Sequence, residues 1–308
     1  MAPGKAPAAT STAAPTSMAA PVLALVFNAF AWGVSWWPFR QLEARGLHPL
    51  WATVLIYAIA VLAISIWRPR SWLQLWRAPA LWVLVLAAGA TNASFNWGVT
   101  IGDVVRVVLL FYLMPLWAVL LARWLLKERL TSLALLRLAL ALAGAAIVLW
   151  PAESSPSSGL AGLPLPRNLP EWLGVLGGFS FALNNVMLKR EAHQPHAARA
   201  LAMFFGGALV AGVLAVVLGV QGSVPWPPLP AAGWVTGALL LALVFLAGNL
   251  ALQFGVSRLP ANVTAVVMIT EVLFAAGSAL ALGAGVLTPQ LMLGGALIIG
   301  ASFLASRG

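Results

Sequence analysis

The chain has 308 residues, of which 62% are hydrophobic and 8% are charged, and its formal net charge at pH 7 is +10. Soluble domains carry about 25% charged residues, so this composition excludes a soluble globular protein and indicates an integral membrane protein. The absence of cysteine excludes disulfides, thiolate catalysis and cysteine metal sites.

Residues 1–19 form a low-complexity segment rich in Ala, Pro, Ser and Thr, which we expect to be a disordered cytoplasmic tail. The segment lacks the apolar stretch of a signal peptide, and the apolar run after it has spanning length without a clear cleavage site. We therefore keep that run as the first membrane span.

Ten apolar runs follow the tail, and each approaches the roughly 20 residues that a membrane-spanning helix needs. Together they predict an all-α polytopic membrane protein with ten transmembrane helices. The runs lie at residues 20–39, 49–67, 79–99, 104–126, 133–150, 171–188, 197–220, 231–256, 261–282 and 290–305.

The basic residues are divided unequally between the two sides of these spans. All Lys and Arg residues except Arg40, Arg45, Arg106 and Arg167 fall on the side of the N-terminus. Because cytoplasmic loops carry the excess of Lys and Arg, both termini are predicted to be cytoplasmic. This topology explains the positive charge better than nucleic-acid binding does. The abundance of Ala and Arg fits a GC-rich bacterial genome, and we expect the chain to lie in a bacterial inner membrane.

The longest polar connection, a linker at residues 153–170 that we expect on the periplasmic side, divides the chain into two halves. The predicted five-helix repeats cover residues 20–152 and 171–308. Since each half contains an odd number of spans, the second half enters the membrane from the opposite face. Inverted-topology repeats of this kind are typical of secondary transporters, whose substrate site lies between the halves.

Two pairs of amide side chains support the repeat. When the sequences of the two halves are aligned so that Asn249 matches Asn92, Gln253 also matches Asn96. Hydrogen bonding between helices explains any single amide equally well, but it explains two matched pairs less readily. We therefore predict that these amides line a central cavity.

The remaining candidate residues are polar, aromatic or sulfur-containing side chains on the same spans, turned inward because polar atoms in a bilayer face protein or water. For Trp32 and Trp117, packing between helices is an equally good interpretation, and for Arg106 the alternative is snorkelling to the headgroups. The predicted substrate-binding residues are Asn28, Trp32, Ser35, Asn92, Asn96, Arg106, Phe111, Met114, Trp117, Phe181, Asn184, Asn249, Gln253, Thr264, Met268 and Glu271.

Glu271 is the only acidic residue near the middle of a predicted span. Three roles are open to it: a proton-coupling site, a protonated donor to a neighbouring helix, or a partner for a substrate ammonium group. The prolines also differ between the halves, because Pro115 interrupts the fourth span and predicts a kink there.

The stretch "YLMPLWAVLLARWLLKERLT" (112–131), with Pro115, Glu128 and Thr131, resembles the fourth span of the drug/metabolite transporter superfamily in its ten-helix EamA-type branch. Two departures stand in the second half, where Val272 follows Glu271 in place of proline and Gly285 replaces an expected acid. Within the superfamily the chain is similar to bacterial aromatic amino-acid exporters of the YddG type. This resemblance implies efflux of neutral and aromatic amino acids by alternating access.

The leading hypothesis is therefore a monomeric inner-membrane exporter of neutral and aromatic amino acids, in contact with membrane lipid and acting by facilitated diffusion. The alternative is a proton-coupled exporter of lipophilic cations or drugs. An intramembrane enzyme is disfavoured because the chain contains no HExxH or GxSxG motif and no nucleophile beside a base. We expect no catalytic residue, cofactor or bound metal.

Overall fold

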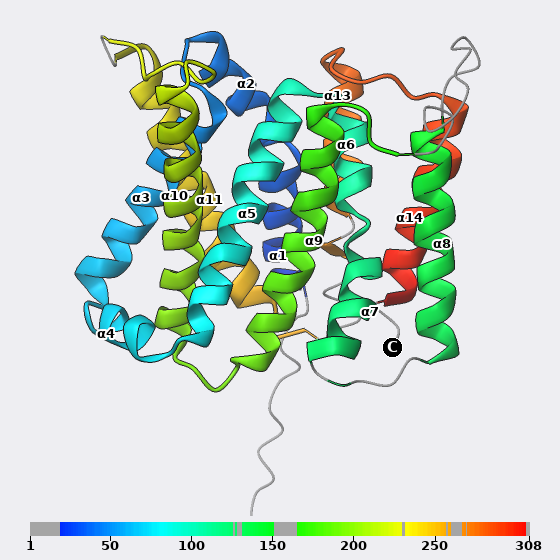
Figure 1. Cartoon of the computed structure of the whole chain (residues 1–308), viewed down its shortest axis with the longest axis horizontal. Helices are drawn as coiled ribbons and strands as arrows, with labels where there is room; N and C mark the ends of the chain where they lie inside the picture. The colour runs from blue at the N-terminus through cyan, green and yellow to red at the C-terminus, as the bar shows by residue number, and fades with distance from the viewer. Residues whose placement is uncertain are drawn as a thin grey trace, which may run out of the picture.

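The computed structural model describes residues 19–125, 127, 131–150, 165–229, 232–256, 258–259, 267–268 and 270–305. These residues form α-helices joined by turns and short connections, and no strand occurs among them (Figure 1). The predicted tail up to residue 18 and most of the predicted linker lie outside the described residues.

The helices of the first half follow the predicted apolar runs closely, with one addition. They are α1 (Ala19–Gly33), α2 (Trp36–Ala44), α3 (Pro49–Trp67), α4 (Arg70–Arg77), α5 (Ala80–Ile101), α6 (Val104–Phe111), α7 (Met114–Leu125) and α8 (Ser132–Leu149). Local capping sets some of the starts: His48 Nδ1 accepts a hydrogen bond from Leu50 N at the start of α3, and Asp103 Oδ1 accepts one from Arg106 N at the start of α6.

The helices of the second half are α9 (Leu169–Arg190), α10 (His196–Val220), α11 (Ala232–Val256), α13 (Thr270–Ala281) and α14 (Pro289–Ala305). The start of α9 carries a reciprocal cap. Glu171 N donates to Asn168 Oδ1 at 3.0 Å, while the Asn168 amide donates back to the Glu171 carboxylate at 3.2 Å.

Two of the predicted spans, the first and the fourth, are each divided into two helices by a two-residue turn. The first is broken at Val34 and Ser35, where the Ser35 hydroxyl donates to Trp32 O at 2.7 Å. The fourth is broken at Tyr112 and Leu113, directly before α7. Pro115 then stands in the first turn of α7, where a missing N–H leaves no helical hydrogen bond unmade.

Helix α4 was not predicted. It follows α3 after a two-residue break and makes an angle of 105° with α5. Its sequence "RSWLQLWR" buries Leu75 and exposes Trp76, as an amphipathic helix lying along a membrane surface does.

Five helical stretches in the described part of the chain are long and apolar enough to cross a membrane, or six if the bent α4–α5 pair counts as one span. Helices α13 and α14 and most of α8 are shorter apolar helices. The predicted count of ten spans remains a prediction.

The helices pack in pairs across the boundary between the halves. Helix α5 contacts α9 and α10, α11 contacts α1 and α3, α6 and α7 contact α9, α13 contacts α1, and α8 contacts α14. Close backbone approach requires glycine at two of these contacts: a Cβ on Gly33 would lie 2.7 Å from Glu271 O, and one on Gly144 would lie 2.6 Å from Gly294 O. Figure 1 shows that α1 rises toward α2 at the upper edge, whereas α9 starts at that edge and descends.

Candidate functional site

A row of aromatic rings crosses the centre of the helix bundle. The Trp32 ring stacks on Phe245 with centroids 4.4 Å apart and meets Phe95 edge-on at 6.5 Å. Phe95 lies 4.8 Å from Phe111, and Phe111 lies 5.3 Å from Phe181. These five rings come from α1, α11, α5, α6 and α9, so both halves of the chain contribute to the row.

The structure thus brings together three predicted aromatic residues, Trp32, Phe111 and Phe181, and adds two that were not predicted. Phe95 lies between Ser94 and Asn96, and Phe245 stands among apolar residues, while the repeat places Leu252 and Ala88 at their equivalent positions. Because neither equivalent residue is aromatic, the internal symmetry does not mark the two phenylalanines in the sequence.

Three predicted asparagines each bury an amide oxygen that accepts no hydrogen bond within the described part of the chain. Asn28 donates its amide N–H to Gly248 O at 2.9 Å, and Asn96 donates to the Thr53 hydroxyl at 3.1 Å, but Oδ1 of each is unpaired. Asn184, 3% exposed, also has an unpaired Oδ1. Because buried polar atoms are nearly always paired, these oxygens are candidate acceptors for a ligand.

Asn92 differs from these three because both ends of its amide are engaged. Its Oδ1 accepts the Tyr57 hydroxyl, and its Nδ2 donates to Ala88 O at 2.7 Å. Asn92 therefore fastens α3 to α5. Its predicted partner Asn249 is half-buried on α11, while the Gln253 side chain lies outside the described residues.

Met114 and Trp117 lie between α7 and α9. The Trp117 ring meets Phe179 edge-on at 5.5 Å, and both Trp117 and Met114 pack against a small apolar cluster that includes Ala182 and Val186. The Trp117 Nε1–H is buried and finds no acceptor among the described residues. Both residues therefore pack against α9, and their role in substrate binding stays a prediction.

Glu271 lies in the first turn of α13 and is half-buried. Its backbone oxygen faces Gly33 of α1, and Tyr112 lies within electrostatic range of its carboxylate. No basic residue pairs with this carboxylate in the part of the chain that the structure describes. Met268 accepts a 3.5 Å hydrogen bond from the Tyr112 hydroxyl at its backbone oxygen, and Thr264 lies outside the described residues.

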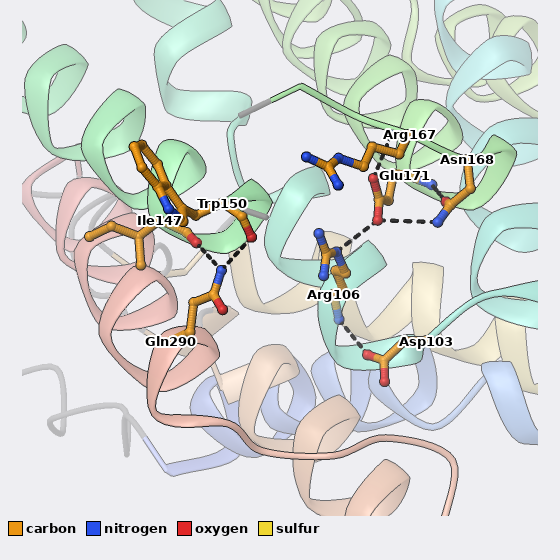
Figure 2. Close-up of polar contacts among 8 residues, drawn as sticks. All are labelled: Asp103, Arg106, Ile147, Trp150, Arg167, Asn168, Glu171 and Gln290. Carbon is orange, nitrogen blue, oxygen red and sulfur yellow. Dashed lines mark hydrogen bonds and ion pairs between the residues drawn. The ribbon is translucent and has the colours of Figure 1, made fainter. Parts of the chain in front are cut away.

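Arg106, predicted as a substrate contact, is occupied by an ion pair (Figure 2). Its Nε lies 2.9 Å from Glu171 Oε1, and the side chains of Arg106 and Glu171 are 30% and 6% exposed. Arg167 N donates to the other Glu171 oxygen at 2.7 Å. Glu171 was not predicted as a partner, although the spacing of Asn168 and Glu171 before an apolar run is the signal of a capping box.

Other polar side chains at the same end of the molecule bind backbone. Arg40 donates to Thr100 O at 2.9 Å and to Gly102 O, which places its charge at the C-terminus of α5. Gln290 donates to Ile147 O at 2.7 Å and Trp150 O at 2.8 Å, and so ties α14 to α8 (Figure 2). Within the described residues, no three His, Asp or Glu side chains form a potential metal site.

Comparison with known proteins gives a match to one family and matches to solved structures. Residues 11–150 match the EamA-like transporter family. A solved structure titled "Crystal structure of protein" is similar over 94% of this chain and 97% of that one, with a TM-score of 0.56 and 17% sequence identity, which shows the fold alone. No curated protein matches the chain.

Proposed function

We propose that this multi-pass membrane protein, whose residues 11–150 match the EamA-like transporter family, exports neutral and aromatic amino acids from bacteria by alternating access. The observation that carries the proposal is the aromatic row around Trp32, whose helices α1, α5 and α9 also carry buried asparagine oxygens that accept no hydrogen bond from the described residues. An apolar body would stack on the rings while an amino group donates to the oxygens.

The asparagines suit an ammonium group because they offer acceptors. An unpaired buried acceptor costs about 1–3 kcal/mol, and a substrate N–H that pairs with it removes that cost. Asn28 on α1 and Asn184 on α9 supply acceptors from opposite halves of the chain. A molecule held between them can be exposed to either side when the halves tilt.

The pattern of helix contacts supports alternating access between inverted repeats. The predicted repeat makes four helix pairs equivalent: α1 and α9, α3 and α10, α5 and α11, and the α6–α7 pair and α13. When each helix is replaced by its equivalent, every contact that these helices make with one another across the two halves becomes another contact that is also observed. The opposite directions of α1 and α9 agree with an exchange that inverts the helices (Figure 1). A two-fold axis in the membrane plane accounts for both observations.

A second candidate, an exporter of lipophilic cations, is favoured by the charges. Arg106 is already paired with Glu171, whereas the Glu271 carboxylate has no basic partner among the described residues. A site with acceptors and one acid, but without a free cation, suits a substrate of positive charge. We rank it second because the three asparagine oxygens require N–H donors, which many lipophilic cations lack.

Flux into liposomes distinguishes the two candidates. Purified protein is expected to carry labelled phenylalanine and alanine down their gradients, and Trp32→Ala is expected to lower phenylalanine flux more than alanine flux. Trp76→Ala is the matched control, because Trp76 is 65% exposed and lies on α4. Uphill movement of tetraphenylphosphonium driven by a pH gradient, and lost in Glu271→Gln, would establish the second candidate instead.

A further inference from the structure

The outer face of the bundle carries an apolar groove between α3 and α11, with a volume of about 290 Å³. Both helices are long and apolar enough to cross a membrane. The walls contain only apolar side chains, and Leu62 and Leu239 are 61% and 47% exposed. None of the five rings of the aromatic row lines the groove, and the lining offers no polar group that could orient a transported molecule. The lining includes Leu55, Ile59 and Leu62 from α3 and Trp234, Ala238 and Leu239 from α11.

One end of the groove is marked by a tryptophan and an arginine. Trp234 donates its indole N–H to Pro228 O at 3.0 Å, an arrangement typical of tryptophans at the membrane interface. Arg45 donates to Gly233 O at 2.8 Å, one residue before Trp234. Arg45 is exposed and forms no ion pair within the described residues, so its remaining N–H groups are free to bind an anion.

The distance along α11 from the Arg45 contact to the groove matches the distance between the polar headgroup and the acyl chain of a lipid. Leu239 lies six residues beyond Gly233, or about 9 Å further into the membrane at 1.5 Å per residue. A positive charge at the interface followed by an apolar channel complements an anionic phosphate followed by an acyl chain. Lipid is also the molecule that faces this surface when the helices cross a bilayer.

We propose that this groove is a binding site for a phospholipid, which places one acyl chain between α3 and α11 and its phosphate on Arg45. The site lies in the leaflet on the side of the α2–α3 connection. A stacked second copy of the chain is disfavoured because it would bury the Arg45 charge without a partner.

The test uses native mass spectrometry of the purified full-length protein titrated with phosphatidylglycerol. Arg45→Gln is expected to weaken binding of the tightest lipid about fivefold, from the roughly 1 kcal/mol that one arginine contributes near a lipid surface. Arg45→Lys is expected to retain binding. Ala58→Trp should also weaken it, because Ala58 is an exposed wall residue whose enlargement fills the groove.

The matched controls are Arg70→Gln, an exposed arginine on α4, and Ala143→Trp, an exposed alanine on α8. Both are expected to bind as the wild type does. Unchanged binding in Arg45→Gln or in Ala58→Trp would overturn the proposal, as would equal losses in the controls. Thermal unfolding in detergent identifies a variant that is misfolded, in which case Arg45→Lys against Arg45→Met decides the phosphate contact.

Discussion

The asparagines near the centre of the molecule illustrate two uses of a buried amide. The Asn92 amide oxygen accepts a hydrogen bond from Tyr57 and its N–H donates one to Ala88 O, so Asn92 holds α3 against α5. Asn184 buries an oxygen that no described residue satisfies. An amide of the first kind stabilises the fold, while an unpaired buried acceptor of the second kind lowers stability.

This contrast predicts opposite effects for the same substitution. Asn184→Leu is expected to leave stability unchanged or raised, because it removes an unpaired acceptor, but to reduce amino-acid flux several-fold. Asn92→Leu is expected to destabilise the protein by about 1–3 kcal/mol, since it strands the Tyr57 hydroxyl. Unfolding in detergent and flux in liposomes measure the two effects. Equal loss of stability in both variants would show that Asn184 is structural.

His48 gives a pH-dependent contribution to stability outside the membrane spans. Burial lowers the pKa of His48 to about 4, and its neutral ring caps α3 through Leu50 N. The unfolded chain binds this proton near pH 6.5, so the contribution is fully present above that pH and is lost as the pH falls through about 4. Thermal unfolding at pH 7 and pH 4.5 should show a smaller drop in His48→Asn, which caps without titrating. An equal drop would exclude His48 as the source.

At the scale of the helices, the Arg106–Glu171 pair joins the ends of α6 and α9. Its two members are unequally buried, because the Arg106 side chain is 30% exposed and that of Glu171 only 6%. Any conformation that opens the bundle between these ends must separate them. The pair is therefore both a packing contact and a barrier to opening.

The unequal burial predicts unequal costs. Arg106→Met leaves a buried carboxylate and should cost about 3 kcal/mol, the range for breaking a buried pair. Glu171→Gln leaves an arginine that water can reach and should cost about 1 kcal/mol or less. The double variant Arg106→Met/Glu171→Leu is expected to recover most of the loss in thermal unfolding. A larger loss in Glu171→Gln than in Arg106→Met would contradict this ordering.

The sequence predicted the long apolar helices well and their interruptions poorly. Runs such as 197–220 match α10 (His196–Val220) because hydrophobic length alone defines them. The break at Ser35 depends on a side-chain bond to Trp32 O, and α4 is too short to stand out as an apolar run. Phe95 and Phe245 were missed in the site because only packing between distant helices brings their rings to Trp32.

At the scale of the whole molecule, the distribution of charge predicts the orientation in the membrane. Helix α4 and the end of α10 lie at opposite edges of the bundle (Figure 1). The excess of basic residues predicts that the α4 edge is cytoplasmic. The two edges also differ in their contacts. At the edge away from α4, Arg40, Arg106 and Gln290 each bind a neighbouring helix.

Cysteine labelling tests this orientation directly, because the natural chain contains no cysteine. Ser223→Cys is expected to react with a membrane-impermeant maleimide in intact cells, since Ser223 is exposed after α10. Arg70→Cys, exposed on α4, is expected to react only after the cells are opened. Labelling of Arg70→Cys in intact cells would reverse the topology.

The contact between α8 and α14 has a consequence for biosynthesis. Gln290 of α14 binds Ile147 O of α8 across 143 positions of the chain. Gly144 of α8 packs against Gly294 of α14, so it has no partner on that side until α14 has been synthesised. At 5–20 residues per second, roughly 7 to 30 s separate the synthesis of the two segments. During that interval α8 lacks its neighbour α14, and the face that carries Gly144 is open to lipid or to insertion machinery. The synthesis of α14 thus completes the packing of α8, and a ribosome stalled before α14 would leave a nascent protein that quality control can recognise.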